Sequence, residues 1–227
     1  MATIRPLDNP IYNALLTEHA VFSMGTGLAR RFPAEIAPFG GLDAGGELDL
    51  LNLFALGEQA ILVGGQPERL DGWEVVKGFE VIQFVHASPS SVPLREPGRE
   101  PVQLLSEDDL AAMLTLTSLA YPSYFRAGTA RLGDYCGIYE GPELIAMAGV
   151  RMRRPGFEEI SAICTHPDHR GRGLGSAVTR FMIDRIVSRV NTPFLHTESD
   201  NPAQLMYRKL GFEDRTLLPV QVLRRVI

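Results

Sequence analysis

The stretch ISAICTHPDHRGRGLGS, residues 160–176, joins an apolar run to a loop with glycines at 171, 173 and 175. The apolar run predicts a strand over 159–165, and the amphipathic pattern after Gly175 predicts a helix. Glycines let an anion approach the backbone, and the first turn of a helix presents unpaired N–H groups and the positive end of its dipole. The loop therefore predicts a phosphate site, to which Arg170 and Arg172 add positive charge.

Two common nucleotide-binding motifs do not fit this loop. A dinucleotide fingerprint needs G-x-G-x-x-G directly after its strand, but position 176 is serine and residues 166–170 intervene. A Walker loop needs Gly-Lys-Ser/Thr, which the sequence lacks here. A glycine-rich turn that only admits a helix stays open as the plain structural alternative.

Two segments of the sequence resemble one enzyme family. Arg170-x-x-Gly173-x-Gly175 resembles the pyrophosphate-binding signature of the GNAT superfamily of N-acetyltransferases, and NPAQLMYRKLGF, residues 201–212, resembles its C-terminal motif. The resemblance covers residues 101–227 and implies an α/β (α+β) fold with a mixed, mainly antiparallel sheet flanked by helices. It also implies that acetyl-CoA is the co-substrate and that the acetyl group passes directly to a primary amine of a small molecule or peptide.

The same resemblance implies which residues hold acetyl-CoA. The pantetheine would lie beside the strand and pair with its backbone, while the diphosphate would sit on the loop. Asn201 would hydrogen-bond the cofactor, although it could equally serve only as the N-cap of the next helix. The implied cofactor-binding residues are Ile163, Cys164, Thr165, Arg170, Gly171, Arg172, Gly173, Leu174, Gly175, Ser176 and Asn201.

Acetyl transfer from a thioester to an amine needs a neutral amine, a stabilised oxyanion and a proton for the leaving thiolate. By resemblance Tyr207 matches the family's general acid, and Glu159 has the place of the general base in the histone-acetyltransferase branch. Each has a structural alternative, since Tyr207 could simply pack on its helix and Glu159 could be an exposed acid at a strand edge. His196, which shares a face of the next strand with Glu198, is the reserve base.

Metal and thiol chemistry are not expected. Cys164, His166 and His169 have a spacing that suggests a metal site, but no second ligand pair accompanies them. Cys136 and Cys164 are expected to be buried thiols, and Cys164 has no evident activating partner that would make it a nucleophile.

The amino-acid composition excludes several classes of protein and partner. The 227 residues are 45% hydrophobic, with 22 basic and 27 acidic side chains, which excludes intrinsic disorder and a small disulfide scaffold. No clearly basic domain appears, so nucleic acid is not an expected partner. No stretch approaches the ~20 apolar residues of a membrane span, so the protein is expected to be soluble and cytoplasmic. The sequence does not predict an oligomeric state.

Prolines at 89, 93, 97 and 101 predict a linker that separates an accessory half, residues 1–100, from the catalytic domain. In the first half we expect helices over 10–22, 27–36 and 47–56, and strands over 59–63 and 73–86. The resemblance implies at most a degenerate second acyltransferase-like half here, as in the glycine N-acyltransferase-like branch. This half has a net charge of −6, which predicts a preference for cationic amines if it lines the acceptor entrance. A non-catalytic acyl-CoA-binding or regulatory module remains the alternative function.

Overall fold

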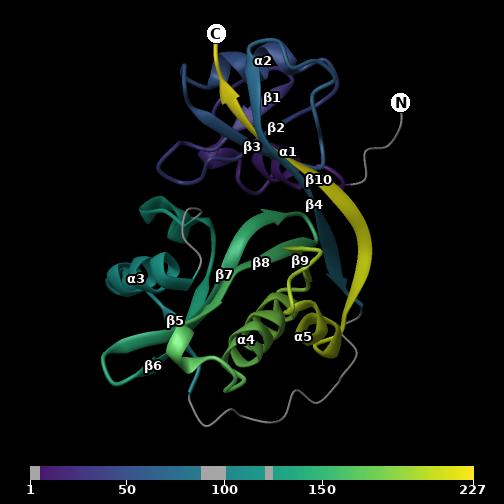
Figure 1. Cartoon of the computed structure of the whole chain (residues 1–227). Helices are drawn as coiled ribbons and strands as arrows, with labels where there is room; N and C mark the ends of the chain where they lie inside the picture. The colour runs from purple at the N-terminus through teal and green to yellow at the C-terminus, as the bar shows by residue number, and fades with distance from the viewer. Residues whose placement is uncertain (1–5, 88–100, 121–124) are drawn as a thin grey trace.

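An eight-stranded sheet runs through the computed structural model, which describes residues 6–87, 101–120 and 125–227 (Figure 1). Its strands are β3 (Gln59–Val63), β4 (Trp73–His86), β5 (Gln103–Leu105), β6 (Tyr135–Glu140), β7 (Glu143–Arg154), β8 (Phe157–Thr165), β9 (Thr192–Glu198) and β10 (Phe212–Arg225). Their order is β3-β10-β4-β9-β8-β7-β6-β5. Only β8 and β9 run parallel, so the sheet is mixed and mainly antiparallel, as predicted.

Helices cover both faces of this sheet. On one face lie α4 (Leu174–Ser188) and α5 (Gln204–Lys209). On the other lie α3 (Leu110–Ala120) and α1 (Pro10–Leu16). Beyond β3 lie the small hairpin of β1 (Ala29–Arg31) and β2 (Gly40–Leu42) and the helix α2 (Glu47–Leu53), which packs against Ala60 and Leu62 on the side of β3 opposite to α1. The longest helix, α4, docks through a stripe spaced four residues apart, because such residues share one face of a helix. Leu174, Val178, Met182 and Ile186 form this buried stripe.

The parallel pair β8 and β9 separates after a short contact. Only Phe157–Glu159 pairs with Thr192–Phe194, and residues 160–165 then have no partner on that side among the described strands. The opposite edge of β8 carries an irregularity, because Met147 pairs with Cys164 but Gly149 pairs with Ser161. The extra residue on β8 is accommodated at Ala162, whose φ of 51° lies in the left-handed region that side chains rarely adopt. A backbone edge is therefore left open in the middle of the sheet.

The sheet takes strands from both halves of the chain. β4 lies between β10 and β9, pairing with Phe212–Arg225 along nearly its whole length and with residues 194–198 on its other edge. The predicted linker, residues 88–101, lies outside the described residues except for Pro101, and the division into two domains at residue 100 stays a prediction. The first half nevertheless supplies an interior strand of the central sheet.

Several predicted elements have the expected bounds and others do not. The strands over 59–63 and 73–86 are confirmed. The helix expected over 27–36 is wrong, because Ala29–Arg31 pairs with Gly40–Leu42 as a β-hairpin. The helix expected over 10–22 ends at Leu16, and the one over 47–56 ends at Leu53. Within the described residues no helix is long and apolar enough to cross a bilayer.

Candidate active site

A cavity of about 520 Å³ lies where β8 and β9 separate. Residues 160–164 of β8 and 196–198 of β9 form its rim. Tyr207 reaches it from the α5 face, where its ring lies 6.0 Å from that of Phe84, whereas His196 reaches it from the opposite face. This cavity, which we call the transfer cavity, therefore passes through the sheet from one face to the other.

A second cavity, of about 580 Å³, lies over the glycine loop. Arg170, Arg180 and Lys209 give its lining a positive charge, which suits an anion. Pro202 lines this loop cavity and the transfer cavity alike, so the two adjoin at the start of α5. Together they form a path from the loop to the opening in the sheet.

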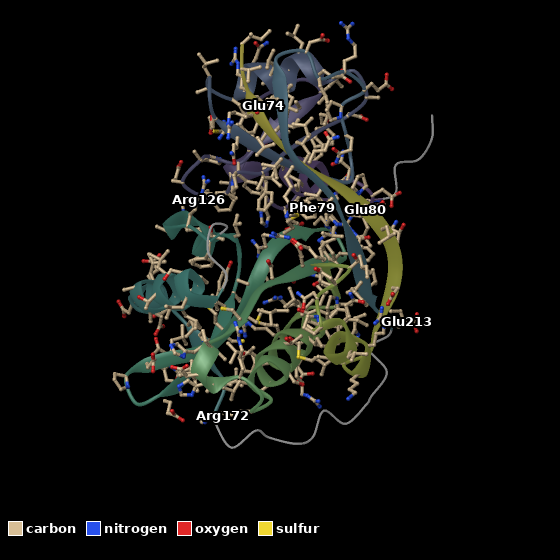
Figure 2. The ribbon with its side chains drawn as sticks, in the orientation of Figure 1. Glu74, Phe79, Glu80, Arg126, Arg172 and Glu213 are labelled. Carbon is tan, nitrogen blue, oxygen red and sulfur yellow. The ribbon has the colours of Figure 1, made fainter. Side chains whose placement is uncertain are left out.

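The predicted cofactor-binding residues divide between the two cavities, with one exception. Thr165, Arg170, Gly171, Gly173, Leu174, Gly175 and Ser176 line the loop cavity, and Ile163, Cys164 and Asn201 line the transfer cavity. Arg172 lines neither, because its guanidinium binds the Glu140 carboxylate at 2.9 Å at the end of the molecule far from the N-terminal elements (Figure 2). The guanidinium also lies 2.6 Å from Nδ1 of His169, which lines the loop cavity, and the expectation that Arg172 adds charge to the anion site stays a prediction.

The loop backbone leaves space for a ligand. Gly171 and Gly173 have φ values of 77° and 79°, and a Cβ at either position would meet nothing within 4 Å. Gly173 is also the N-cap of α4, where the first N–H groups of the helix are unpaired by the helix itself. Asn201 is not the N-cap of α5, because the helix begins only at Gln204. The side-chain oxygen of Asn201 instead accepts a hydrogen bond from the Ala203 N–H at 2.9 Å, in the turn before the helix.

Glu159 is fully buried, so its interpretation as an exposed strand-edge acid is wrong. Its carboxylate accepts two hydrogen bonds from Arg151, at 2.9 and 2.5 Å, and lies 2.7 Å from Nδ1 of His196. Burial alone would raise the pKa of Glu159, but the Arg151 guanidinium and the His196 hydrogen bond together lower it to about 2. Glu159 is therefore ionised and has little affinity for a proton at neutral pH.

A chain of hydrogen bonds determines which tautomer of His196 is present, that is, which ring nitrogen carries the hydrogen. Arg215 donates to Oε1 of Gln83, so the Gln83 amide nitrogen faces the other way and donates to Leu7 O and to Nε2 of His196, both at 2.9 Å. Since Nε2 accepts, Nδ1 carries the hydrogen and donates it to Glu159. Arg151, Gln83 and Arg215 were not predicted from the sequence, although a glutamine inside the apolar run 73–86 was a visible signal.

The buried Glu159 predicts a pH-dependent stability. A pKa of about 2 in the fold, against 4.5 for an ordinary glutamate, corresponds to about 3 kcal/mol of stability that is present above pH 5 and lost as the pH falls towards 2. Urea titrations across this range should show the loss in the wild type and a flatter profile in Glu159→Gln. Glu213→Gln, which alters an exposed glutamate on β10, is the control and should keep the wild-type profile. Equal profiles for wild type and Glu159→Gln would contradict the assignment.

Both cysteines are buried free thiols, as expected. Burial raises the pKa of Cys164 to about 12, so the thiol lining the transfer cavity is protonated and a poor nucleophile. In the part of the chain that the structure describes, no group of three or more His, Cys, Asp or Glu side chains could hold a metal ion.

The sequence is similar to those of known acetyltransferases. A family described as FR47-like protein matches residues 135–218. The N-alpha-acetyltransferase RimI of Mycobacterium tuberculosis is 35% identical over 83 residues, which are 35% of this chain and 51% of that protein. The mycothiol acetyltransferase of Corynebacterium glutamicum is 31% identical over 81 residues, which are 35% of this chain and 28% of that protein. The chain thus spans about half, or less, of the length of these relatives.

The fold and site define a class of protein in which a positively lined glycine loop lies beside a split in a mixed sheet. A crystal structure from Novosphingobium aromaticivorans, described as a GNAT-family acetyltransferase, matches with a TM-score of 0.89 and 30% identity over 97% of this chain and 99% of that one. This chain therefore belongs to the GNAT family of acetyltransferases.

Proposed function

We propose that this chain transfers an acetyl group from acetyl-CoA directly to a primary amine. The observation that carries the proposal is the path formed by the two cavities, which adjoin at Pro202 and end in an opening through the sheet. A cofactor with an anionic end and a thioester end fits such a path, and the opening gives an amine access to the thioester from the other face. The GNAT relatives support the reaction but not a particular acceptor.

The loop cavity is the proposed site for the diphosphate. Backbone N–H groups from Gly171 to Ser176 would donate to it, and Arg170, Arg180 and Lys209 would balance its charge. The pantetheine would lie along residues 163–165, where β8 has no neighbour towards β9 among the described strands. The thioester then reaches the transfer cavity beside Tyr207.

Replacing Gly173 with valine should weaken binding of CoA at least tenfold in calorimetry. The new side chain would occupy the space left for the diphosphate and would resist the φ of 79°. Gly156→Val is a matched control, because Gly156 also has a φ of 79° and open space around it but lies in the turn between β7 and β8. The site assignment fails if both variants bind CoA equally well.

In the proposed reaction the amine nitrogen attacks the thioester carbon, and the C–S bond breaks as the tetrahedral adduct collapses. Tyr207 gives its proton to the departing thiolate. His196 rather than Glu159 is the proposed base, because His196 lines the transfer cavity while Glu159 does not and is paired with Arg151. The Glu159 carboxylate would stabilise the imidazolium that forms when Nε2 exchanges its Gln83 hydrogen bond for the amine proton.

The function is tested by following CoA release when amines are added to the protein with acetyl-CoA. Turnover above the hydrolysis rate, with the acetylated amine seen by mass spectrometry, is the expected result. Binding of acetyl-CoA without turnover across a broad panel of amines would instead support the acyl-CoA-binding or regulatory module. Membership of the glycine N-acyltransferase-like branch and a cytoplasmic location stay predictions.

A further inference from the structure

The N-terminal half lines the transfer cavity with apolar side chains, contrary to the acidic entrance that its net charge suggested. Its lining residues are Phe39, Ile61, Val63, Phe79 and Val81. Among the described residues, no acidic side chain of this half lines the cavity. One charged group of this half that contacts a lining residue is a cation, Lys77, whose Nζ lies 4.3 Å from the centre of the Phe79 ring. The structure thus gives no support for recognition of a cationic acceptor by this half.

Strand pairing holds this wall together. Val220 of β10 lies directly opposite Val63 of β3 and Phe79 of β4, so the three side chains point to the same face of the sheet. Val81 follows Phe79 on that face, opposite Glu198 of β9. Figure 2 shows Phe79 midway along the molecule, between the N-terminal elements and the body that carries α4. We call Val63, Phe79, Val81 and Val220 the apolar wall.

The charged side chains that line the transfer cavity lie outside the apolar wall. Arg151 lines the cavity, but its guanidinium is bound to the carboxylate of Glu159, so the two charges offset each other. Glu198 and Asp200 are exposed and lie at the end of β9, next to the turn that leads to α5 and Tyr207. The cavity is therefore polar where the thioester would arrive and apolar where the rest of an acceptor would lie.

We infer that the acceptor is a primary amine carried on an apolar body, an aliphatic chain or an aromatic ring, which packs against the apolar wall. This inference rests on the proposed acetyl transfer and adds the chemical class of its substrate. The amino group would lie towards Tyr207 and His196, and the apolar body would displace water from the wall. The acids that line the cavity, Glu198 and Asp200, lie at its β9 end, with Glu198 opposite Val81, whereas Val220 lies opposite only Val63 and Phe79. A second ammonium carried past Val81 towards Val220 and Val63 would therefore be placed against apolar side chains.

A series of straight-chain amines from propylamine to heptylamine tests this, because the amino group stays the same and only the apolar body grows. The value of kcat/KM should rise about fourfold for each methylene until the cavity is filled. Pentylamine should exceed 1,5-diaminopentane by at least tenfold. Turnover that is flat along the series, or faster with the diamine, overturns the inference and leaves acetyl transfer standing.

If no amine turns over, the proposed acetyl transfer fails, and calorimetry of the same amines on the CoA-loaded protein then decides the inference separately. Affinity that rises with chain length supports the apolar site, and affinity that does not rise overturns it.

Val220→Thr keeps the side-chain shape but makes the wall more polar, so it should reduce the gain per methylene severalfold. Val222→Thr is the matched control, since Val222 is on the same strand and in the same core cluster, 7% exposed against 4%, but does not line the cavity.

Discussion

Replacing Tyr207 with phenylalanine is expected to lower kcat about 100-fold while leaving the affinity for acetyl-CoA nearly unchanged. The substitution keeps the ring that packs between Phe84 and Phe212, at centroid distances of 6.0 and 6.3 Å, and removes only the hydroxyl. The thiolate would then have to leave without its proton donor. Steady-state kinetics and calorimetry on the same preparation separate the two effects.

Tyr12→Phe serves as the control for this prediction. Tyr12 is also a buried tyrosine, but it lies on α1 and lines neither cavity. Its variant should keep wild-type kcat. Full activity of Tyr207→Phe would mean that water or another group protonates the thiolate. A parallel loss of acetyl-CoA affinity would mean that the hydroxyl binds the cofactor instead.

A fragment of residues 101–227 is expected to be unfolded or insoluble and to bind no CoA. Without β4 the sheet loses the strand between β9 and β10, and both edges would be left unpaired. The fragment would also expose the apolar side chains that Phe84 covers, including Tyr207 and Leu195. Circular dichroism and calorimetry with CoA measure the two outcomes.

Adding residues 1–100 as a separate polypeptide during refolding provides the control, and it should restore some CoA binding because strand pairing needs no covalent link. A folded fragment 101–227 that binds CoA alone would contradict this prediction and would support two independent domains. The point variant Phe84→Ala tests the same strand within the whole chain. It should cost about 3–5 kcal/mol of unfolding free energy, the usual range for a fully buried phenylalanine.

Local pattern was enough to predict the elements around the glycine loop. The spacing Gly171, Gly173, Gly175 followed by an amphipathic run predicted α4, although the helix begins at Leu174 and so includes Gly175. The apolar residues that follow Gly175 are buried, as the helical period predicted. The strands over 59–63 and 73–86 were also predicted with their observed bounds, because they are rich in β-branched and aromatic residues. The helix expected over 27–36 failed because pairing with residues 40–42 overrode local preference.

The transfer cavity could not be predicted in this way. Its apolar wall depends on the register that brings Val63, Phe79 and Val220 together from three strands, and register is a property of the folded sheet. The burial of Glu159 was equally hidden, because its partner Arg151 is on a neighbouring strand whose pairing is irregular at that point. The sequence shows that residue 159 is a glutamate, but only the tertiary contacts with Arg151 and His196 show why its side chain stays ionised.

The position of β4 in the sheet also determines when the sheet can form during protein synthesis. Residues 73–86 leave the ribosome well before their main partner, since His86 pairs with Phe212 and Trp73 with Arg225. The central sheet therefore cannot close until β10 has been made, and contacts between such distant segments form slowly. During that interval β4 presents unpaired backbone groups and apolar side chains, which are the features that chaperones and aggregating chains recognise. Expression at low temperature should accordingly raise the soluble yield of this protein.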